Sequence, residues 1–457
     1  MKHLFAGLFL GLVALSAIAW RIQPKPAGKG KIVLTWVSDD NPARRQQIAL
    51  FNQLNPGYHL RLDPTNTGTE KVIVGCIGGV GPDLFDCYDG FQLSAYVKSG
   101  IAWDVTDAIA AAGINASEDT WAASHPNFIL EGRVFGFPTN ASVNAIWFNK
   151  DILEKRGIPF PKGPWTWEEF IPLAQKLTVR DESGRIEHFG FMFDWWNWQH
   201  FCRQWGGRVY SKDGTRCVLD SPENIAAIQL MQDLIYKHKV APSPVEEAAI
   251  ATQGGWGSGT ITFFGGGKAA MALGGRWWLC TLRDYQGIRL GAIECPHGPL
   301  RVFRGYGRAT LINKASPRRQ EALEFLKYLA ARPYNDLINH QADALAPVKR
   351  YCYTPEYLHD PDFPNEDFNA AWRDVMEYGI PDEVSPFVNG NVAGRLFGKQ
   401  LDLVKNGQKT AAEAMKAAAR EINREILKSL ERDPSLRERY RRLTDGGKSQ
   451  HQAPNPK

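Results

Sequence analysis

The chain has 457 residues, of which 44% are hydrophobic and 23% charged, and its formal net charge is +5 at pH 7. This is the composition of an ordinary soluble globular protein, and beyond the N-terminus no apolar run approaches bilayer length, which argues against an integral membrane protein. The positive charge is spread along the chain, and part of it lies in the mixed Arg and Glu stretch 420–442, typical of a solvated helical face, so nucleic-acid binding is not indicated.

The first residues have the layout of a secretory signal peptide. Met1-Lys2-His3 is basic, residues 4–20 are almost continuously apolar, and Ala17-Ile18-Ala19 offers a small-x-small cleavage site. We expect residues 1–19 to be a cleaved signal peptide or, because Trp20 is an awkward residue after a cut, an N-terminal membrane anchor. The rest of the chain is therefore expected outside the cytoplasmic membrane, in the periplasm or at the cell surface.

The 430 or so residues that follow are too many for a single hydrophobic core and suit two lobes. Residues 31–37 are apolar on both faces, like a buried parallel strand, and a predicted helix follows from Pro42 with Asn41 as its N-cap. Residues 58–62 complete a βαβ unit, whose ligands bind at the carboxyl ends of the strands. The candidate ligand-binding residues at this edge are Trp36, Asp39, Asp40 and Asn41.

A second strand-like segment, residues 81–86, ends just before Asp89, which we take as another candidate at the same edge. From residue 133 the chain becomes extended and passes Asn140, a further candidate. A capping box over Thr166-Trp-Glu-Glu169 then predicts the start of a new set of helices.

The sequence holds 15 tryptophans. Sugar rings stack their C–H faces on aromatic side chains, so tryptophans that do not belong to a core are candidate sugar contacts. Within residues 194–205, helical spacing puts Trp195, Trp198, Cys202 and Trp205 on one core-facing stripe and leaves Trp196 off it. Trp256 lies among glycines, where it has little core to join. Trp196 and Trp256 are therefore cleft candidates.

Seven cysteines raise the question of disulfides in an exported chain. Cys202 with Cys217 and Cys280 with Cys295 share one spacing, and the pairing of each is left open. Cysteine and histidine spacing offers no zinc site.

Six segments stand out in order along the chain. They are Gly81-Pro-Asp83, Phe148-Asn-Lys-Asp151, Trp165-Thr-Trp-Glu-Glu-Phe170, Gly265–Met271 with Gly275-Arg-Trp277, Tyr306–Ser316 with Glu321–Leu326, and Asn406-Gly407 with Thr410–Ile422. In this order they resemble the extracellular solute-binding proteins of sugar ABC transporters (family 1, maltose-binding-protein-like). Arg276 stands where that family usually has Pro, and Phe148 where it has Tyr, so the familiar substrate is not carried over.

The resemblance implies an α/β, two-lobed periplasmic-binding-protein fold of class II type with a ligand cleft between the lobes. It implies that hinge closure traps the ligand, because only the closed form lets both lobes touch it. The boundaries it implies are 31–141 plus 287–311 for lobe 1, 142–286 plus 312–443 for lobe 2, and a disordered tail over 444–457.

In function, the resemblance implies the substrate-binding component of an ABC importer, a monomer that delivers a carbohydrate, expected to be an oligosaccharide, to membrane permease subunits. Trp277 aligns with the family's stacking Trp, and Arg308 near the second lobe crossing is a weaker candidate. No catalytic residue, metal or cofactor is expected.

Two alternatives use similar residues. A glycoside hydrolase also lines its cleft with Trp and acidic residues, but it needs two carboxylates flanking the scissile bond, and Asp39 and Asp40 should diverge at a helix start. A sensor-type binding protein would share the fold and the site, and only its membrane partner would differ.

Overall fold

The computed structural model describes residues 30–183, 186–250 and 259–449, together with Phe9, Val13 and Ser16. The predicted signal segment over residues 1–19 lies almost wholly outside these residues, and Trp256 lies outside them as well. No helix in the described ranges is long and apolar enough to cross a membrane.

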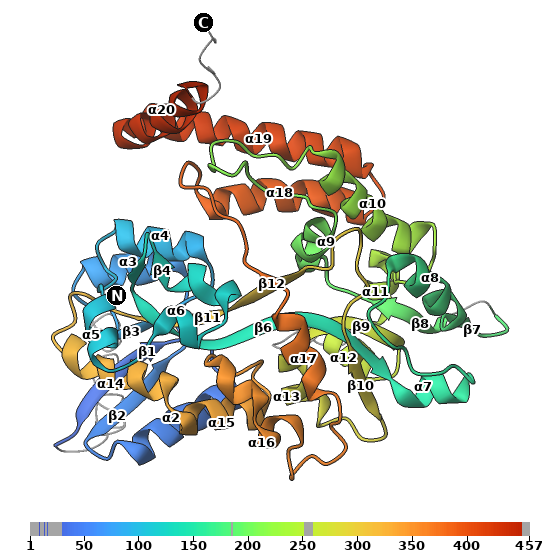
Figure 1. The fold of residues 1–457 in the computed structure, drawn as a ribbon, viewed down its shortest axis with the longest axis horizontal. Helices are drawn as coiled ribbons and strands as arrows, with labels where there is room; N and C mark the ends of the chain where they lie inside the picture. Colours follow the sequence, from blue (N-terminus) through green and yellow to red (C-terminus); the bar gives the residue numbers. More distant parts are fainter. Residues whose placement is uncertain are drawn as a thin grey trace, which may run out of the picture.

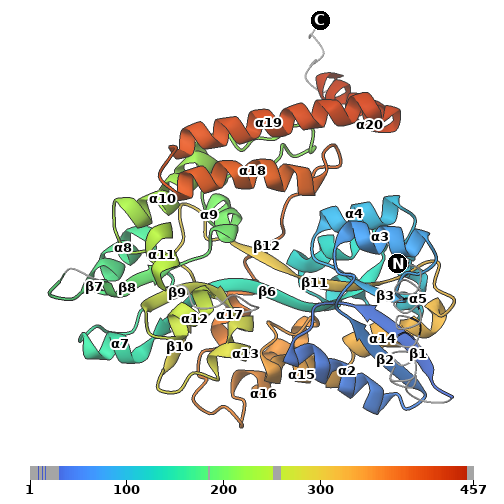
Figure 2. The same cartoon turned by 180° about the vertical axis from the view of Figure 1, so that it is seen from behind.

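The chain folds into two α/β lobes, as predicted, each with its own hydrophobic core. Figures 1 and 2 show the lobes side by side, joined by the long strand β6, which runs across the middle of the molecule in both views. The first core gathers side chains such as Trp36, Phe85 and Phe325, and the second gathers Trp147, Phe191 and Trp372.

The first lobe begins with the predicted βαβ unit, in which β1 lies parallel to β2 and β3. Asn41 caps α2 as predicted, because its side chain accepts a hydrogen bond from the Arg44 backbone N–H at 2.8 Å and Pro42 follows it. The elements of this lobe are β1 (Ile32–Val37), α2 (Pro42–Leu54), β2 (Tyr58–Asp63), α3 (Thr69–Ile77), β3 (Leu84–Cys87), α4 (Gly90–Lys98), α5 (Thr106–Ala111), α6 (Ala116–Asp119), η1 (Ala122–Asn127), β4 (Ile129–Leu130) and β5 (Arg133–Val134).

Two antiparallel strands carry the chain between the lobes. The first, β6 (Gly136–Asn149), is about 46 Å long at the usual rise of a strand. Its first half pairs with β11 (Phe303–Ile312) in lobe 1, and its second half pairs with β9 (Ala269–Gly275) and β10 (Leu290–Ile293) in lobe 2. The strand order β2-β1-β3-β11-β6-β9-β8-β7 therefore passes through both lobes, and the connection between the lobes is part of the sheet; here β8 is Ile186–Met192 and β7 is Val179–Arg180.

The second lobe packs helices around β9 and β8. The predicted capping box is present at α8, where Thr166 and Glu169 each bond to the other's backbone N–H. Its elements are α7 (Lys150–Lys155), α8 (Trp167–Lys176), β7 (Val179–Arg180), β8 (Ile186–Met192), η2 (Trp195–Asn197), α9 (Trp198–Gln204), α10 (Pro222–Tyr236), α11 (Pro244–Ile250), α12 (Thr260–Gly265), β9 (Ala269–Gly275), η3 (Arg276–Trp278), α13 (Leu279–Leu282), β10 (Leu290–Ile293), η4 (Lys349–Tyr353), α16 (Pro355–Leu358), α17 (Asn369–Met376) and β12 (Gly379–Ile380).

The later lobe boundaries differ from those expected. β10 pairs with residues 146–149 of β6 in the second lobe, so the chain returns to lobe 1 along β11 and not near residue 287. Helices α14 (Arg319–Ala330) and α15 (Arg332–Gln341) then pack Phe325 and Tyr334 into the first core, although 312–443 was assigned to lobe 2. Periodicity indicates that a helix has one buried face, but it does not tell which core that face meets. We propose boundaries that follow the two cores.

Three helices close the chain: α18 (Gly390–Lys405), α19 (Ala411–Arg432) and α20 (Pro434–Ser449). They lie above α9 and α10 of the second lobe in both views. From there α20 reaches toward lobe 1, where an Arg439 guanidinium nitrogen lies 3.5 Å from a Glu131 carboxylate oxygen. A disordered tail was expected from residue 444, but α20 continues to Ser449, and residues 450–457 lie outside the described residues.

All seven cysteines fall in the described ranges, and none is bridged. The two pairs of equal spacing make separate contacts: the Cys280 thiol lies 3.0 Å from the Gln341 carbonyl, and the Cys295 thiol lies 3.2 Å from the Asn144 carbonyl. Cys202, Cys217 and Cys295 are small buried side chains, and Cys280 is partly buried.

Candidate functional site

A cavity of about 280 Å³ opens between the lobes over the paired part of β6 and β11. We call it the central pocket. Both lobes and both crossing strands contribute to its lining, so a ligand held there would touch both lobes. The lining residues are Asp39, Asn41, Arg44, Tyr88, Asn140, Ser142, Trp277, Tyr306, Gly307, Arg308, Asp343 and Ala344.

The structure brings five of the predicted ligand-binding residues together in the central pocket. They come from four separate parts of the chain, the end of β1, the crossing strand β6, η3 and β11. The five are Asp39, Asn41, Asn140, Trp277 and Arg308.

Two other predicted residues do not line the central pocket. Asp40 points to the surface, where both its carboxylate oxygens bind Arg45 at 2.8 Å, because neighbouring residues at a helix start diverge. Trp36 is fully buried in the first core, and its indole N–H donates to Asp86 at 2.8 Å. Trp36 therefore packs behind the central pocket and holds Asp86 in position.

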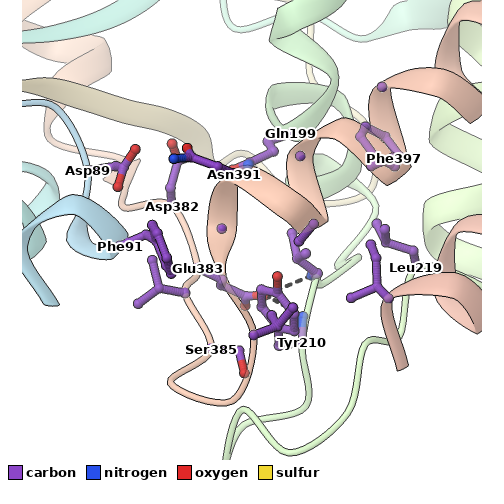
Figure 3. Close-up of a pocket in the computed structure, with 18 of the residues that line it drawn as sticks. Asp89, Phe91, Gln199, Tyr210, Leu219, Asp382, Glu383, Ser385, Asn391 and Phe397 are labelled. Atoms are coloured by element: carbon purple, nitrogen blue, oxygen red, sulfur yellow. Dashed lines mark hydrogen bonds between the residues drawn. The ribbon is translucent and has the colours of Figure 1, made fainter. Parts of the chain in front are cut away.

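The remaining predicted residues within the described ranges, Asp89 and Trp196, line a neighbouring cavity of about 360 Å³, which we call the side pocket. Figure 3 shows residues of its lining, which comes from the start of α4 in lobe 1, from η2, α9 and the segment after it, from α18 and the loop before it, and from α19. Asp89 also caps α4, accepting from the Gln92 backbone N–H at 2.7 Å.

Arg308 is the centre of the ionic network in the central pocket. Its side chain is only 4% exposed, and its guanidinium lies 2.8 Å from Asp39 and 2.8 Å from the Thr139 hydroxyl. Arg44, equally buried, lies 3.1 Å from Asp39 and 3.2 Å from Asp343. Burial by itself would lower the pKa of Arg44, but Asp343 and Asp39 raise it, so the guanidinium stays charged.

The turn that presents Asp343 is conformationally unusual. Ala342 and Ala344, on either side of it, have φ angles of +61° and +70°. Non-glycine residues in this region are uncommon, and each costs about 1 kcal/mol or more. The surrounding contacts compensate, since the chain here bridges to β6 through Ala141 and Leu345. Backbone strain of this kind is common at ligand sites. Here the strained turn holds the Asp343 carboxylate beside Arg44 and Arg308.

Behind the pocket, Asp86 accepts hydrogen bonds from the Trp36 indole at 2.8 Å and the Thr310 hydroxyl at 2.7 Å, and Arg308 lies 3.4 Å away. Burial raises the pKa of Asp86 to about 7, against the lowering effects of Arg44, Ser38 and Thr310. Asp86 therefore fixes the strand ends and Arg308, and does not itself line the cavity.

The floor of the central pocket is the shared face of the two crossing strands. Successive side chains of a strand alternate between its faces, so Arg304, Tyr306 and Arg308 of β11 lie on one face about 7 Å apart. Asn140 and Ser142 of β6 pair with Arg308 and Tyr306. The result is a polar stripe along the floor of the central pocket.

Tyr306 connects the floor to the aromatic wall. Its hydroxyl donates to the Asn144 side chain at 2.8 Å and accepts from the Trp277 indole N–H at 3.2 Å. Trp196 meets the Tyr306 ring edge-on with 5.6 Å between centroids, and Arg304 lies over both rings. Trp277 and Trp196 thus flank one tyrosine at the junction of the two pockets.

Several buried polar atoms around this floor have no hydrogen-bond partner within the described part of the chain. Leaving such a group unpaired costs about 1–3 kcal/mol, so a native protein usually satisfies it with water or a ligand. The atoms are Arg44 Nε, Asn197 Nδ2, Gln199 Oε1, Arg304 Nη1 and Arg308 Nη2.

Sequence reasoning missed four important lining residues: Arg44, Tyr88, Tyr306 and Asp343. The alternation Arg304-x-Tyr306-x-Arg308 in a strand could have indicated Tyr306. Arg44 looked like an ordinary surface residue of a helix, and Asp343 lies some 300 residues from its partner Arg44, so no local pattern joins them.

His200, next to the side pocket, gives a pH prediction. Burial, assisted by the Arg304 charge, lowers the pKa of His200 to about 3 from its ordinary 6.5. Between these values the unfolded chain binds a proton that the native state does not. The free energy of unfolding is therefore expected to fall as the pH drops from 6.5, by up to about 1.4 kcal/mol per pH unit.

Urea unfolding of the wild type and of His200→Gln, at pH 7.5 and pH 5, measures this effect. The difference in stability between the two proteins should shrink or reverse at the lower pH. A difference that is the same at both pH values would show that His200 is protonated in the folded state too.

One group of side chains in the described ranges has a spacing that could hold a metal ion: His340, Asp360 and Asp362. His340 Nδ1 lies 2.9 Å from Asp360 and Nε2 lies 3.9 Å from Asp362, so both ring nitrogens already face carboxylates. None of the three lines the central pocket or the side pocket.

Residues 37–336 match the family model for the bacterial extracellular solute-binding protein. Among curated relatives, the chain is 22% identical over 423 residues to the sn-glycerol-3-phosphate-binding periplasmic protein UgpB of Escherichia coli (strain K12), covering 84% of this chain and 88% of that protein.

Two solved structures have similar folds. The ABC substrate-binding protein Lmo0181 from Listeria monocytogenes, in complex with cycloalternan, has a TM-score of 0.74 at 22% identity, covering 86% of this chain and 98% of that chain. Maltose-bound MalE3 of T. maritima has a TM-score of 0.69 at 21% identity, covering 86% and 99%.

Proposed function

The chain belongs to the family of bacterial extracellular solute-binding proteins, and from that premise we propose that it captures a neutral carbohydrate in the central pocket and delivers it to an ABC importer. The observation that carries the proposal is the polar floor of β6 and β11, with unpaired buried donors beside Trp277 and Tyr306. Sugar hydroxyls need dense hydrogen-bonding partners, and sugar C–H faces need an aromatic surface.

The charges in the central pocket favour a neutral ligand. Its lining contains two arginines, Arg44 and Arg308, and two aspartates, Asp39 and Asp343, which are paired with one another. A phosphate, such as the ligand named for the Escherichia coli relative, would gain from the arginines but would meet both carboxylates. The two similar solved structures are complexes with cycloalternan and with maltose, which are neutral sugars.

Hinge closure is the proposed mechanism of capture. The central pocket draws Asp39 and Tyr88 from lobe 1, Trp277 from lobe 2, and its floor from the crossing strands. A ligand that contacts all of them favours the form in which the lobes approach, since only that form makes every contact. The closed form would then be recognised by permease subunits in the membrane.

Export completes the proposal. The basic and apolar residues 1–19 would direct the chain across the cytoplasmic membrane, where it would act as a monomer in the periplasm or at the cell surface, held by this segment if it stays uncut. The family's description as extracellular supports this location.

Binding without turnover is the proposed outcome for a bound sugar. The lining contains two carboxylates, Asp39 and Asp343, and both are paired with arginines. A carboxylate in such a pair is better suited to accept hydrogen bonds from sugar hydroxyls than to donate the proton that glycoside hydrolysis requires. Release of reducing ends from oligosaccharides by the purified protein would contradict this part of the proposal.

Isothermal titration calorimetry against mono- and oligosaccharides, sn-glycerol-3-phosphate and glycerophosphocholine tests the ligand class. We expect at least one neutral sugar to bind with a Kd in the micromolar range or below, about −8 kcal/mol, and the phosphorylated compounds to bind more than tenfold more weakly. Small-angle scattering should show a smaller radius of gyration with the bound sugar. Binding of a phosphorylated polyol but no sugar would overturn the carbohydrate assignment.

A further inference from the structure

We propose that the exposed side of α19 binds the phosphate headgroups of an anionic phospholipid bilayer and holds the exported protein reversibly against the membrane. We call this side the basic face. Its residues line neither the central pocket nor the side pocket, so the inference is independent of which solute the protein captures. The residues are Lys416, Arg420, Arg424, Leu427 and Lys428.

The net positive charge of the chain is concentrated in its last three helices. Residues 390–449, which form α18, α19 and α20, contain 14 Lys and Arg but only 8 Asp and Glu. They carry a net charge of +6, whereas the whole chain carries +5. Elsewhere Asp and Glu balance the Lys and Arg that are spread along the chain. A local excess of one sign creates a field that attracts a partner of the opposite sign.

Helical spacing gathers four cations on one side of α19. Ile422 and Ile426 are buried in the second core, and the opposite side of the helix is exposed. The four cations of the basic face recur there every four residues, from Lys416 to Lys428, and span about 18 Å. Figures 1 and 2 show α19 above α18, on the side of the helical layer away from the sheet. The basic face is therefore open to a large flat partner.

Three cations of the basic face have no carboxylate partner. Lys416, Arg420 and Arg424 form no ion pair within the described part of the chain. Glu431, one turn beyond Lys428, marks the end of the basic face. The other acidic side chains of α19 turn to partners of their own, Glu413 to Thr410, Glu421 to Gln400 and Glu425 to Lys428. The unpaired cations are free to meet phosphate groups.

A neighbouring loop widens the positive surface. Asn423 of α19 accepts a hydrogen bond from the Cys217 backbone N–H at 2.8 Å and donates one to the Cys217 carbonyl at 2.9 Å. These bonds hold the loop before Cys217 against α19. Its exposed Lys212 and Arg216 have no ion-pair partner among the described residues, and Asp213 between them bonds within the loop.

Two features of α19 favour a bilayer over another polyanion. Leu427 is 56% exposed in the middle of the basic face. An aliphatic side chain among cations suits a headgroup layer, because acyl chains lie directly below the phosphates. In addition, α19 contains no Phe, Trp or Tyr on which the bases of a single-stranded nucleic acid could stack.

The expected attachment is weak and reversible. Each Lys or Arg near an anionic membrane surface strengthens binding about fivefold, so four cations give an association constant of about 10³ M⁻¹. This value corresponds to half binding near about 1 mM lipid. Attachment of this strength keeps the protein beside the membrane that carries its permease and still allows it to leave.

Sedimentation with vesicles tests the inference. The protein is the chain from residue 20, which the predicted cleavage leaves and which contains both hydrophobic cores. The vesicles are phosphatidylcholine, alone or with about 30% phosphatidylglycerol. We expect about half of the protein to sediment with about 1 mM of the anionic lipid and less than about a tenth with phosphatidylcholine alone. Raising the salt to about 0.5 M should release it, because salt screens the attraction.

A triple variant places the binding on α19. Lys416→Gln, Arg420→Gln and Arg424→Gln together should weaken sedimentation by at least about 30-fold, because three cations are lost. Glutamine has a helix propensity close to that of Lys and Arg, and all three positions are exposed, so the melting temperature should not change. Leu427→Gln should weaken binding by about threefold or more and leave its salt dependence as it is.

The matched control removes the same charge from another part of lobe 2. Lys155→Gln, Lys162→Gln and Lys176→Gln replace three exposed lysines around α7 and α8 that form no ion pair in the described ranges. This variant should lose no more than about threefold, since the altered charges lie outside the basic face.

Four results would overturn the inference. Absence of sedimentation with the anionic vesicles would exclude the surface, and equal sedimentation with phosphatidylcholine alone would make the attachment apolar. An equal loss in the two triple variants would assign binding to net charge and not to the basic face. Tighter binding to a DNA duplex at the same phosphate concentration would assign the face to nucleic acid. Calorimetry with sugars is unaffected by any of these results, so the proposed function is tested separately.

Discussion

Replacing Arg308 with leucine is expected to lower the free energy of unfolding by about 3–5 kcal/mol and to abolish ligand binding. Arg308 is almost fully buried, and Asp39, Asp86 and Asp343 all lie within 4.0 Å of its guanidinium. Without it, buried carboxylates lose a counter-charge, and the floor loses the donor Arg308 Nη2, which is left for a ligand. Urea denaturation and calorimetry measure the two losses.

Two further variants show which property of Arg308 matters. Arg308→Lys keeps the charge but loses the planar fork that reaches Thr139 and Asp39 together, so it should recover much of the stability and little of the binding. Arg301→Leu removes a more exposed arginine paired with Glu294, and should change stability by about 1 kcal/mol or less. If Arg308→Leu were as stable as Arg301→Leu, the ionic network would not hold this site together.

Replacing Trp277 with alanine is expected to weaken sugar binding by about 30-fold or more, equivalent to about 2 kcal/mol, with little loss of stability. Trp277 is partly buried against the second core, lines the central pocket and donates its indole N–H to Tyr306 at 3.2 Å. Calorimetry with the best neutral sugar and thermal unfolding measure the two effects. Unchanged affinity would assign Trp277 to the core.

The neighbouring tryptophan is a matched control. Trp278 is 1% exposed in the second core, so Trp278→Ala should cost about 3–5 kcal/mol of stability instead. Gly275→Ala provides a second test of Trp277, because the added Cβ would lie 2.4 Å from the Trp277 ring and would displace it. Its affinity should fall as in Trp277→Ala.

The features predicted correctly from the sequence are local or lie on regular elements. Asn41 and Thr166 cap their helices because a cap depends on residues within one turn. The stripe of Trp195, Trp198 and Cys202 packs in or against the second core, as its spacing predicted. Asp39 lines a cavity at the carboxyl end of a parallel strand, where such sheets bind their ligands, and its contact with a ligand stays a prediction.

The incorrect predictions concern which face or which lobe a segment meets. Asp40 was named as a candidate beside Asp39, but the two side chains diverge, as their positions at a helix start predicted, and Asp40 binds Arg45 at the surface. Helices α14 and α15 were assigned to lobe 2, although their apolar faces meet the first core. Trp196 lies off the core stripe as its spacing predicted, and it lines the side pocket together with Asp89, so their role as ligand contacts stays a prediction.

By itself, the sequence determined the fold class, the family and the strand ends that could meet a ligand, since periodicity, caps and ordered motifs are short-range properties that each segment carries alone. Only the tertiary structure decided the composition of the site. Arg44, Arg308 and Asp343 are far apart in the chain, and their pairing depends on how α2, β11 and the turn after α15 pack. The division into a central and a side pocket likewise depends on the distances between packed elements.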